Sequence, residues 1–334
     1  MATFRLPPSL LLSLATLFWA GNFAFGKVLV ATLPPITLSL VRWSLSFLVL
    51  LPFAWRDVRD ALPLLRQHAK PLLTMAVTGV AGFNALTYVA LQSTTAINAA
   101  LMNTAAPIVV LALSRVLLGE RVKPVQLVGI VLSCAGVLWI LVGGDLHRLR
   151  TLTFHLGDVL MLVAITAWGL YSVLMKKHGH LLPQRASFLV TIAMACALLF
   201  PLAATERAEW DAFLTLSPMA LALLIYVGTF PSVIAFLLWN RAVMIIGPSR
   251  ASIYLNLIVL FAAILGALVL GERVTLAHVV GGILVMGGVY LATAPTPFRW
   301  SRRPTQFETP EVRSSFVAGD GKTVTRPAKR NPNK

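Results

Sequence analysis

One charged side chain stands inside a long apolar stretch of this sequence. Arg42 lies seven residues into the stretch 35–54, which places it about 10 Å below a membrane surface if that stretch is a helix rising about 1.5 Å per residue. An arginine at such a depth costs up to roughly 2.5–3.5 kcal/mol on insertion scales. Arg42 is therefore either a counter-charge for a substrate carboxylate or phosphate, or a side chain that snorkels outward or caps the carbonyls of an unwound segment.

Polar and aromatic residues at helical spacing form a second group of candidates. Asn84, Tyr88 and Gln92 recur every four residues and therefore share one face of a helix. Ser232 and Phe236 begin a second such stripe. The residues that we expect to line a substrate cavity are Trp19, Asn22, Arg42, Asn84, Tyr88, Asn98, Asn103, Trp168, Tyr171, Trp239, Asn240, Tyr254 and Asn256.

These stripes must face the inside of a membrane protein, because a polar group that faces lipid has no hydrogen-bond partner. Inside the protein, each residue contacts either a substrate or a neighbouring helix, and a tryptophan can also belong to a belt at the membrane interface.

The stretch 97–117 adds a further feature. Pro107 cannot donate the backbone N–H that would bond the carbonyl of Asn103, so we predict a kink there. The kink either helps to form a transport site or is a static feature of packing.

Residues that could carry out enzymatic chemistry are missing from the sequence. No Asp or Glu lies deep in an apolar stretch, Asp158 coming closest, and the motifs HExxH and GxSxG and a phosphate-binding glycine loop do not occur. Cys134 and Cys196 lie among apolar residues without metal-ligand spacing. We therefore predict that the protein is not an enzyme and has no catalytic residue, metal site or cofactor.

The elements that position these candidates follow from the composition. Of 334 residues, 57% are hydrophobic and only 12% are charged, against roughly 25% charged in average soluble domains. Apolar stretches of about 20 residues, enough to cross a bilayer as a helix, recur along most of the chain. We predict an all-α polytopic membrane protein with ten transmembrane helices, at 10–29, 35–54, 72–91, 97–117, 124–142, 156–175, 186–204, 219–240, 251–270 and 275–293.

The basic residues predict the orientation in the membrane. If the chain crosses ten times, 22 of the 28 Lys and Arg residues fall on the side of the N-terminus and five on the other, with Arg42 inside a span. By the positive-inside rule, both termini are cytoplasmic and the protein lies in the plasma (inner) membrane. The distribution of the net charge of +16 thus reflects the orientation of the protein in the lipid bilayer, and we expect no binding to nucleic acid. The polar, basic residues 295–334 are predicted to be a disordered cytoplasmic tail.

A five-residue motif occurs twice and indicates a duplication. Leu-Gly-Glu-Arg-Val occupies 118–122 and 270–274, and the same offset of 152 residues superimposes Gly129 on Gly281 and Gly136 on Gly288. We predict one repeat over 10–142 and a second over 156–293. Since each repeat contains five spans, an odd number, the second must enter the membrane from the opposite side, which makes the pair inverted repeats.

The duplicated motif itself falls between the fourth and fifth spans of each repeat. Gly119 and Glu120 in the first copy, and Gly271 and Glu272 in the second, are interpreted as structural turns in preference to a gate, because Gly ends a helix readily and charged residues hold a turn at the water interface. The glycine pairs that follow lie on one face of a helix and favour close packing of the fifth and tenth spans as a scaffold.

Together these features resemble the EamA-type members of the drug/metabolite transporter superfamily. The resemblance rests on the two five-helix repeats, the Gly-Glu turns, the stretches Trp19-Ala20-Gly21-Asn22 and Trp168-Gly169, and the pair Arg42-Trp43. It implies a secondary transporter that exports or exchanges small polar metabolites, amino acids or their derivatives among them, by alternating access. The sequence departs from that family at Val259, opposite Pro107, where proline is common, and at Trp43, where phenylalanine is common.

Two alternatives remain at this stage. A nucleotide or nucleotide-sugar exchanger would need several cations in the membrane to bind phosphate, and Arg42 is the one that the sequence supplies. A non-transporting membrane scaffold would have little use for so many inward polar and aromatic side chains. We expect a small-molecule substrate as the partner.

Overall fold

The computed structural model describes residues 6–30, 32–94, 96–151, 153, 155–209, 216–270 and 274–293. The predicted tail 295–334 and the second turn, with Gly271 and Glu272, lie outside the described residues. Every regular element in the described part of the chain is helical, and eight stretches are long and apolar enough to cross a membrane. The protein is therefore an all-α polytopic membrane protein.

The helices fall into ten successive segments that match the predicted spans. In the first half, the first, second and fifth segments are single helices: α1 (Pro8–Val30), α2 (Pro35–Asp60) and α8 (Pro124–Leu141). The third segment consists of α4 (Ala69–Met75), η1 (Ala76–Gly82) and α5 (Phe83–Ser93), and the fourth consists of α6 (Ala96–Asn103) and α7 (Ala106–Leu118). In the second half, the sixth, seventh and tenth segments are single helices: α9 (Leu156–His178), α10 (Gln184–Ala203) and α16 (Leu276–Thr293). The eighth segment consists of α12 (Pro218–Thr229), η5 (Phe230–Ile234) and α13 (Ala235–Ile246), and the ninth consists of α14 (Pro248–Ala251), η6 (Ser252–Asn256) and α15 (Leu257–Leu270).

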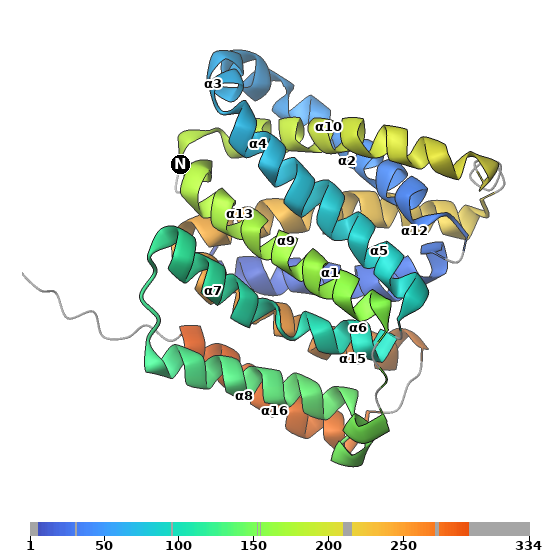
Figure 1. The fold of residues 1–334 in the computed structure, drawn as a ribbon, viewed down its shortest axis with the longest axis vertical. Helices are drawn as coiled ribbons and strands as arrows, with labels where there is room; N and C mark the ends of the chain where they lie inside the picture. Colours follow the sequence, from blue (N-terminus) through green and yellow to red (C-terminus); the bar gives the residue numbers. More distant parts are fainter. Residues whose placement is uncertain are drawn as a thin grey trace, which may run out of the picture. The chain divides into compact units, whose positions relative to one another are not determined.

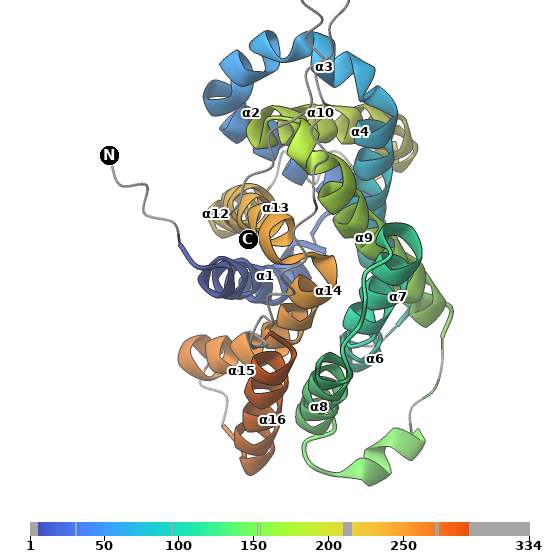
Figure 2. The same cartoon turned by 90° about the vertical axis from the view of Figure 1, so that its left-hand side faces the viewer.

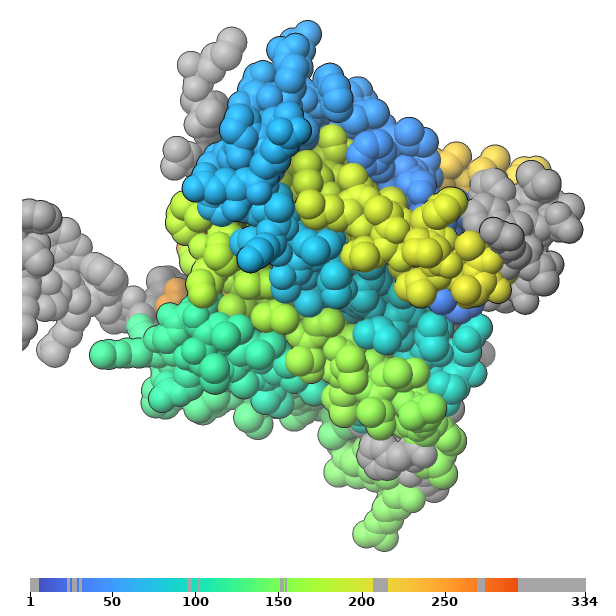
Figure 3. Space-filling view, turned by 45° about the horizontal axis from the view of Figure 1, so that its top comes forward, coloured from blue at the N-terminus to red at the C-terminus, as the bar shows by residue number. Residues whose placement is uncertain are grey.

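Short helices connect these segments outside the apolar stretches. They are α3 (Leu62–Gln67), η2 (Leu146–Thr151), η3 (Gly179–Leu181) and η4 (Ala204–Glu209). On the face drawn in Figure 3, α10 and the segment from α3 to α5 cover one side of the molecule, and α10 packs against α4 and η1.

Four of the ten segments are interrupted, in positions that the two halves share. The third and eighth segments each contain a π-helical turn, η1 and η5 respectively. The fourth segment breaks between Asn103 and Ala106, with Pro107 in the first turn of α7, where the sequence predicts a kink. The ninth changes from α14 to the tight 3-10 turn η6 before α15 begins. These interruptions are the main departure from ten continuous helices.

The equivalent helices of the two halves run in opposite directions. At one end of the bundle, α2 packs against α10, and Thr37 meets Glu206 while Ser44 meets Cys196, so the numbers rise along one helix and fall along the other. At the other end, α8 and α16 lie side by side in antiparallel fashion (Figures 1 and 2).

The contacts between the remaining helices repeat across the two halves. α9 of the second half packs against α5 and α7 of the first, and α1 of the first half packs against α13 and α15 of the second. The first helix of each half is thus enclosed by the third and fourth segments of the other half. This exchange, together with the antiparallel pairs, is the arrangement of inverted repeats.

Candidate functional site

Arg42 lies at the centre of a hydrogen-bonded network that joins three transmembrane segments. Its side chain is 1% exposed. Its Nε donates to Ser232 Oγ of η5 at 2.5 Å, and its Nη1 donates to Asn84 Oδ1 and Tyr88 Oη of α5, each at 3.0 Å. The guanidinium also lies 5.3 Å from the ring centroid of Trp43, within cation–π range. Arg42 therefore does not snorkel to the surface.

The π-helical turns place the acceptors for Arg42. Ser232 Oγ donates to the carbonyl of Val227 at 2.7 Å, which leaves its lone pairs for the guanidinium. Asn84 Nδ2 donates to the carbonyl of Val80 at 3.0 Å, just inside η1, and this turns Asn84 Oδ1 toward Arg42. A π-helical turn leaves carbonyls without their usual helical partner, and such turns are frequent at functional sites.

The network neutralises no charge. All three hydrogen-bond partners of Arg42 are neutral, and within the described residues the ion pairs are the exposed Arg59–Asp60 and Arg148–Asp145. A buried cation without a carboxylate is costly, because neutral dipoles replace only part of its hydration. The arrangement keeps a positive charge available inside the protein.

A cluster of aromatic rings packs beside this network. Trp19 of α1 and Trp168 of α9, which an offset of 149 residues superimposes near the start of the two halves, meet edge to face with ring centroids 5.3 Å apart. Phe236 of α13 contacts both, at 5.8 and 5.4 Å, and also contacts Trp43 at 5.2 Å. The aromatic cluster comprises Trp19, Trp43, Phe83, Trp168, Tyr171, Phe188, Phe236 and Trp239.

Some polar atoms of the aromatic cluster have partners and others do not. Trp19 Nε1 donates to the carbonyl of Pro231 at 2.9 Å, and Tyr171 Oη donates to Asn240 Oδ1 at 2.9 Å. Three other buried donors in this region have no hydrogen-bond partner among the described residues: Trp43 Nε1, Trp168 Nε1 and Asn240 Nδ2. Each such donor costs about 1–3 kcal/mol. Groups of this kind, next to a buried cation, suit a ligand that supplies acceptors.

The structure brings most of the predicted cavity residues together. Arg42, Asn84 and Tyr88 share the network, while Trp19, Trp168, Tyr171, Trp239 and Asn240 belong to the aromatic cluster or contact it.

Other predicted residues have different surroundings. Asn98 Nδ2 donates to the carbonyl of Thr153 at 2.8 Å and to Asp158 Oδ2 at 3.2 Å, and so helps to hold the start of α9. Asn256 Nδ2 donates to Ser133 Oγ of α8 at 2.9 Å. Asn22 and Asn103 are half-buried, and Tyr254 is buried in η6.

Five contributors to the site are absent from the predicted cavity residues. Two of them, Ser232 and Phe236, lie on a stripe that helical spacing does reveal. Trp43 follows Arg42 directly, so it falls off the stripe that helical spacing reveals, and only its place in the family motif draws attention to it. Phe188 and Phe83 carry no pattern that separates them from ordinary apolar residues. Polarity at helical spacing therefore finds the network better than the aromatic cluster.

The first Gly-Glu turn joins the two halves. Gly119 caps α7 in the left-handed conformation, with φ of 67°, which glycine adopts without strain. Glu120 then accepts a hydrogen bond from the hydroxyl of Ser249 in α14. The turn thus contacts the start of the ninth segment in addition to ending a helix. No group of three or more metal-ligating side chains occurs in the parts of the chain that the structure describes.

An all-α membrane fold of inverted repeats around a buried cation and aromatic rings defines a protein of the small-molecule transporter class. Comparison with known families agrees. The model of the EamA-like transporter family matches residues 6–142 and 155–294, and the chain belongs to this family.

Individual relatives support the assignment. A protein named "Uncharacterized transporter" from Archaeoglobus fulgidus is 34% identical over 294 residues, covering 85% of this chain and 96% of that one. The "Uncharacterized transporter YyaM" of Bacillus subtilis is 26% identical over 284 residues, covering 83% and 90%. A solved crystal structure with 18% identity superimposes with a TM-score of 0.66 over 86% of this chain and 96% of that one, which is a likeness of fold.

Proposed function

We propose that this protein carries small polar metabolites with a carboxylate, most directly amino acids or their derivatives, out of the cell or in exchange across the plasma (inner) membrane. The two inverted halves alternate access to a site formed by Arg42 and the aromatic cluster. Both termini are cytoplasmic in this proposal, as the distribution of basic residues favours. The family supports transport, and the observation that carries the substrate class is the buried Arg42 without a carboxylate partner.

The charge and the unpartnered donors favour a substrate with acceptor oxygens. A carboxylate can accept from a guanidinium and from one or two further N–H groups, and such charge-assisted bonds are roughly twice as strong as neutral ones. Trp168 Nε1 and Asn240 Nδ2 lack acceptors, and both lie beside Tyr171. A carboxylate of the substrate would balance the charge of Arg42, and further acceptor groups of the substrate would satisfy Trp168 Nε1 and Asn240 Nδ2.

The single buried cation also separates this proposal from a nucleotide exchanger. Among the cations whose side-chain burial the structure describes, Arg42 is the only one that is fully buried. A nucleotide or nucleotide sugar carries two or more phosphate charges, and several buried cations would be needed to offset their desolvation. One cation matches one carboxylate.

The rings must separate for a substrate to enter. The tryptophans of the aromatic cluster contact one another at 5.3–5.4 Å between centroids, so the cluster is closed in this conformation. Since α1 and α9 each pack within the opposite half, a movement of one half against the other would part Trp19 from Trp168. This is the movement that alternating access requires.

Counterflow in proteoliposomes tests the proposal. Vesicles loaded with one unlabelled solute at a time, from a panel of amino acids and other metabolites, are assayed for exchange with the labelled form. We expect exchange for carboxylate-bearing solutes and at least a tenfold loss in Arg42→Gln. Arg241→Gln is the matched control, because Arg241 is exposed on α13 and loses the same charge.

Two results would contradict the proposal. If Arg42→Gln exchanged solutes at the wild-type rate while eluting as a monodisperse protein, the guanidinium would have no part in recognition. If the wild-type protein exchanged no amino acid or derivative in the panel but did exchange another solute, the substrate class would be wrong and transport itself would stand.

A further inference from the structure

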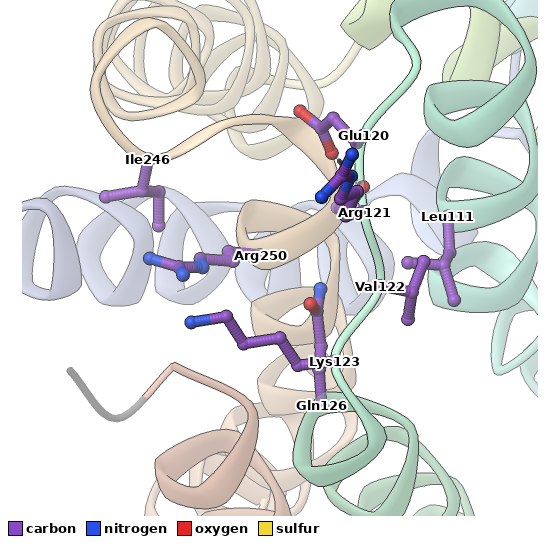
Figure 4. Close-up of a pocket in the computed structure, with 9 residues that line it drawn as sticks. Leu111, Glu120, Arg121, Val122, Lys123, Gln126, Ile246 and Arg250 are labelled. Carbon is purple, nitrogen blue, oxygen red and sulfur yellow. Dashed lines mark hydrogen bonds between the residues drawn. The ribbon is translucent and has the colours of Figure 1, made fainter. Parts of the chain in front are cut away.

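A second polar site lies at the first Gly-Glu turn, away from the aromatic cluster. A cavity of about 210 Å³ opens there between the two halves of the protein (Figure 4). The first half contributes the turn with Glu120, Arg121 and Lys123 and the first turn of α8 with Gln126. The second half contributes Arg250 of α14 and its neighbour Ser249.

The charge of this cavity is positive. Arg121, Lys123 and Arg250 line it, against one carboxylate, Glu120. That carboxylate accepts a hydrogen bond from the hydroxyl of Ser249, and among the described residues no ion pair joins it to Arg121 or Arg250. Walls that carry one sign of charge concentrate counter-ions in a cleft.

An unpartnered donor gives a second, independent indication. Gln126 is 6% exposed, and its Nε2 has no hydrogen-bond partner among the described residues. Its side chain lines the cavity and extends toward the turn that carries Arg121, while Lys123 and Arg250 extend to one side together (Figure 4). A buried amide N–H without an acceptor requires an oxygen from elsewhere.

The helix that carries Gln126 adds to this preference. α8 begins at Pro124, with Lys123 as its N-cap, so its N-terminal turn lines the cavity. The partial positive charge of a helix N-terminus attracts anions. Cations, an orphan donor and a helix N-terminus thus converge on one volume.

We propose that this cavity binds a phosphate-type oxyanion, supplied either by free phosphate or by the headgroup of an anionic lipid. The site goes beyond the proposed transport function and does not depend on it. Because Gln126 belongs to one half and Arg250 to the other, the anion bridges the halves. The bound anion therefore stabilises the conformation in which this end of the protein is closed. The size of this effect depends on how much more tightly the anion binds the closed conformation than the open one.

The first experiment titrates inorganic phosphate into the purified full-length protein in neutral detergent, at constant ionic strength, and follows heat release and the thermal midpoint. We expect saturable binding in the wild type and at least tenfold weaker binding in Arg250→Gln. Gln126→Leu, which removes the donor and keeps the volume, should weaken binding severalfold. Arg115→Gln is the control, because Arg115 is exposed in the last turn of α7 and loses the same charge; its affinity should stay within twofold of the wild type.

The second experiment identifies the source of the oxyanion. The protein is placed in nanodiscs of phosphatidylcholine, with or without phosphatidylglycerol, and phosphate is titrated again. If the anionic lipid raises the thermal midpoint and weakens phosphate binding in the wild type but not in Arg250→Gln, the headgroup occupies the site. If phosphate binds equally in both nanodiscs, the free anion does.

The proposal is overturned if phosphate does not bind to the wild type in detergent. It is also overturned if Arg250→Gln and Gln126→Leu bind phosphate as tightly as Arg115→Gln, because the ion would then associate with the basic surface in general.

Discussion

The seam between α8 and α16 and the core around Arg42 both join the two halves of this protein, but by different means. In the seam, Gly129 packs against Gly288 and Gly136 against Gly281, so that backbone meets backbone. In the core, bulky rings and a charged side chain fill the space, and three donors lack acceptors. The seam is closed by backbone contacts, whereas the core contains buried donors without acceptors among the described residues.

This difference separates the parts of the protein by role. Small residues on facing helices allow close van der Waals contact, which holds helices together in lipid where the hydrophobic effect gives no preference. Unpartnered donors destabilise the core, because each one costs about 1–3 kcal/mol in the unliganded state. Since the seam joins the halves at one end, movement under the proposed function would occur in the core.

The largest effect should come from filling the seam. In Gly288→Ala, the new Cβ would lie 2.5 Å from both the carbonyl oxygen of Gly129 and the amide nitrogen of Ser133, and helix backbones cannot yield as side chains do. We expect a loss of about 3 kcal/mol of stability, measured as a fall in the denaturation midpoint in detergent.

The neighbouring residue supplies the control for this prediction. A Cβ at Gly287 meets nothing nearer than Leu132 Cδ2 at 3.8 Å, so Gly287→Ala should unfold like the wild type. If the two variants were equally stable, close backbone packing would not be what holds α8 against α16.

A smaller loss should follow from removing an acceptor of Arg42. Asn84→Leu leaves the guanidinium buried with one neutral partner fewer, which costs about 2 kcal/mol. Replacing the cation as well, in Asn84→Leu with Arg42→Met, should recover part of this stability, because an apolar side chain needs no acceptor. The free energy of unfolding of both variants tests the point.

Gln92→Leu is the matched control for Asn84→Leu. Gln92 lies on the same helical stripe but is exposed, so its replacement should change stability by less than about 0.5 kcal/mol. A double variant that is less stable than Asn84→Leu alone would argue that Arg42 is held by packing and not by its hydrogen bonds.

The smallest effect should distinguish two tryptophans in equivalent positions. Trp19 Nε1 donates to the carbonyl of Pro231, whereas Trp168 Nε1 has no acceptor among the described residues. Both Trp→Phe changes remove similar apolar area, so their stabilities should differ by about 1 kcal/mol, with Trp19→Phe the less stable.

Substrate binding should rank the same two variants in the reverse order. Under the proposed function, the free N–H of Trp168 is available to a substrate oxygen, so Trp168→Phe should weaken substrate affinity severalfold more than Trp19→Phe. Equal affinities in the two variants would remove Trp168 Nε1 from the site.

The sequence predicts the ten helical segments well because hydropathy is a local property and lipid demands about 20 apolar residues for each crossing. It also predicts their inversion, since a repeat of five spans must reverse direction, as the antiparallel pairs α2–α10 and α8–α16 confirm. The π-helical turn η1 has no comparable signal, whereas η5 contains Pro231, which cannot donate a backbone N–H to the carbonyl of Val227. They depend on side chains such as Asn84 and Ser232, which hold displaced carbonyls only once neighbouring helices surround them.

The candidate site divides in the same way. Helical spacing places Asn84 and Tyr88 on one inward face, and depth in an apolar stretch singles out Arg42. Polarity within an apolar stretch also selects Asn98 and Asn256, which in the structure donate hydrogen bonds to Asp158 and Ser133. The sequence alone does not distinguish a polar residue that binds a ligand from one that binds another helix.

What the sequence determined by itself is therefore the number, order and direction of the helices, because each follows from composition and from an odd repeat. Only the tertiary structure decided that Arg42 meets Ser232, 190 residues away, and that Trp43 and Phe236 close the cluster around it. The physical reason is that these contacts depend on how one half crosses the other. That crossing is determined by the packing of many helices together, so no single segment of the sequence predicts it.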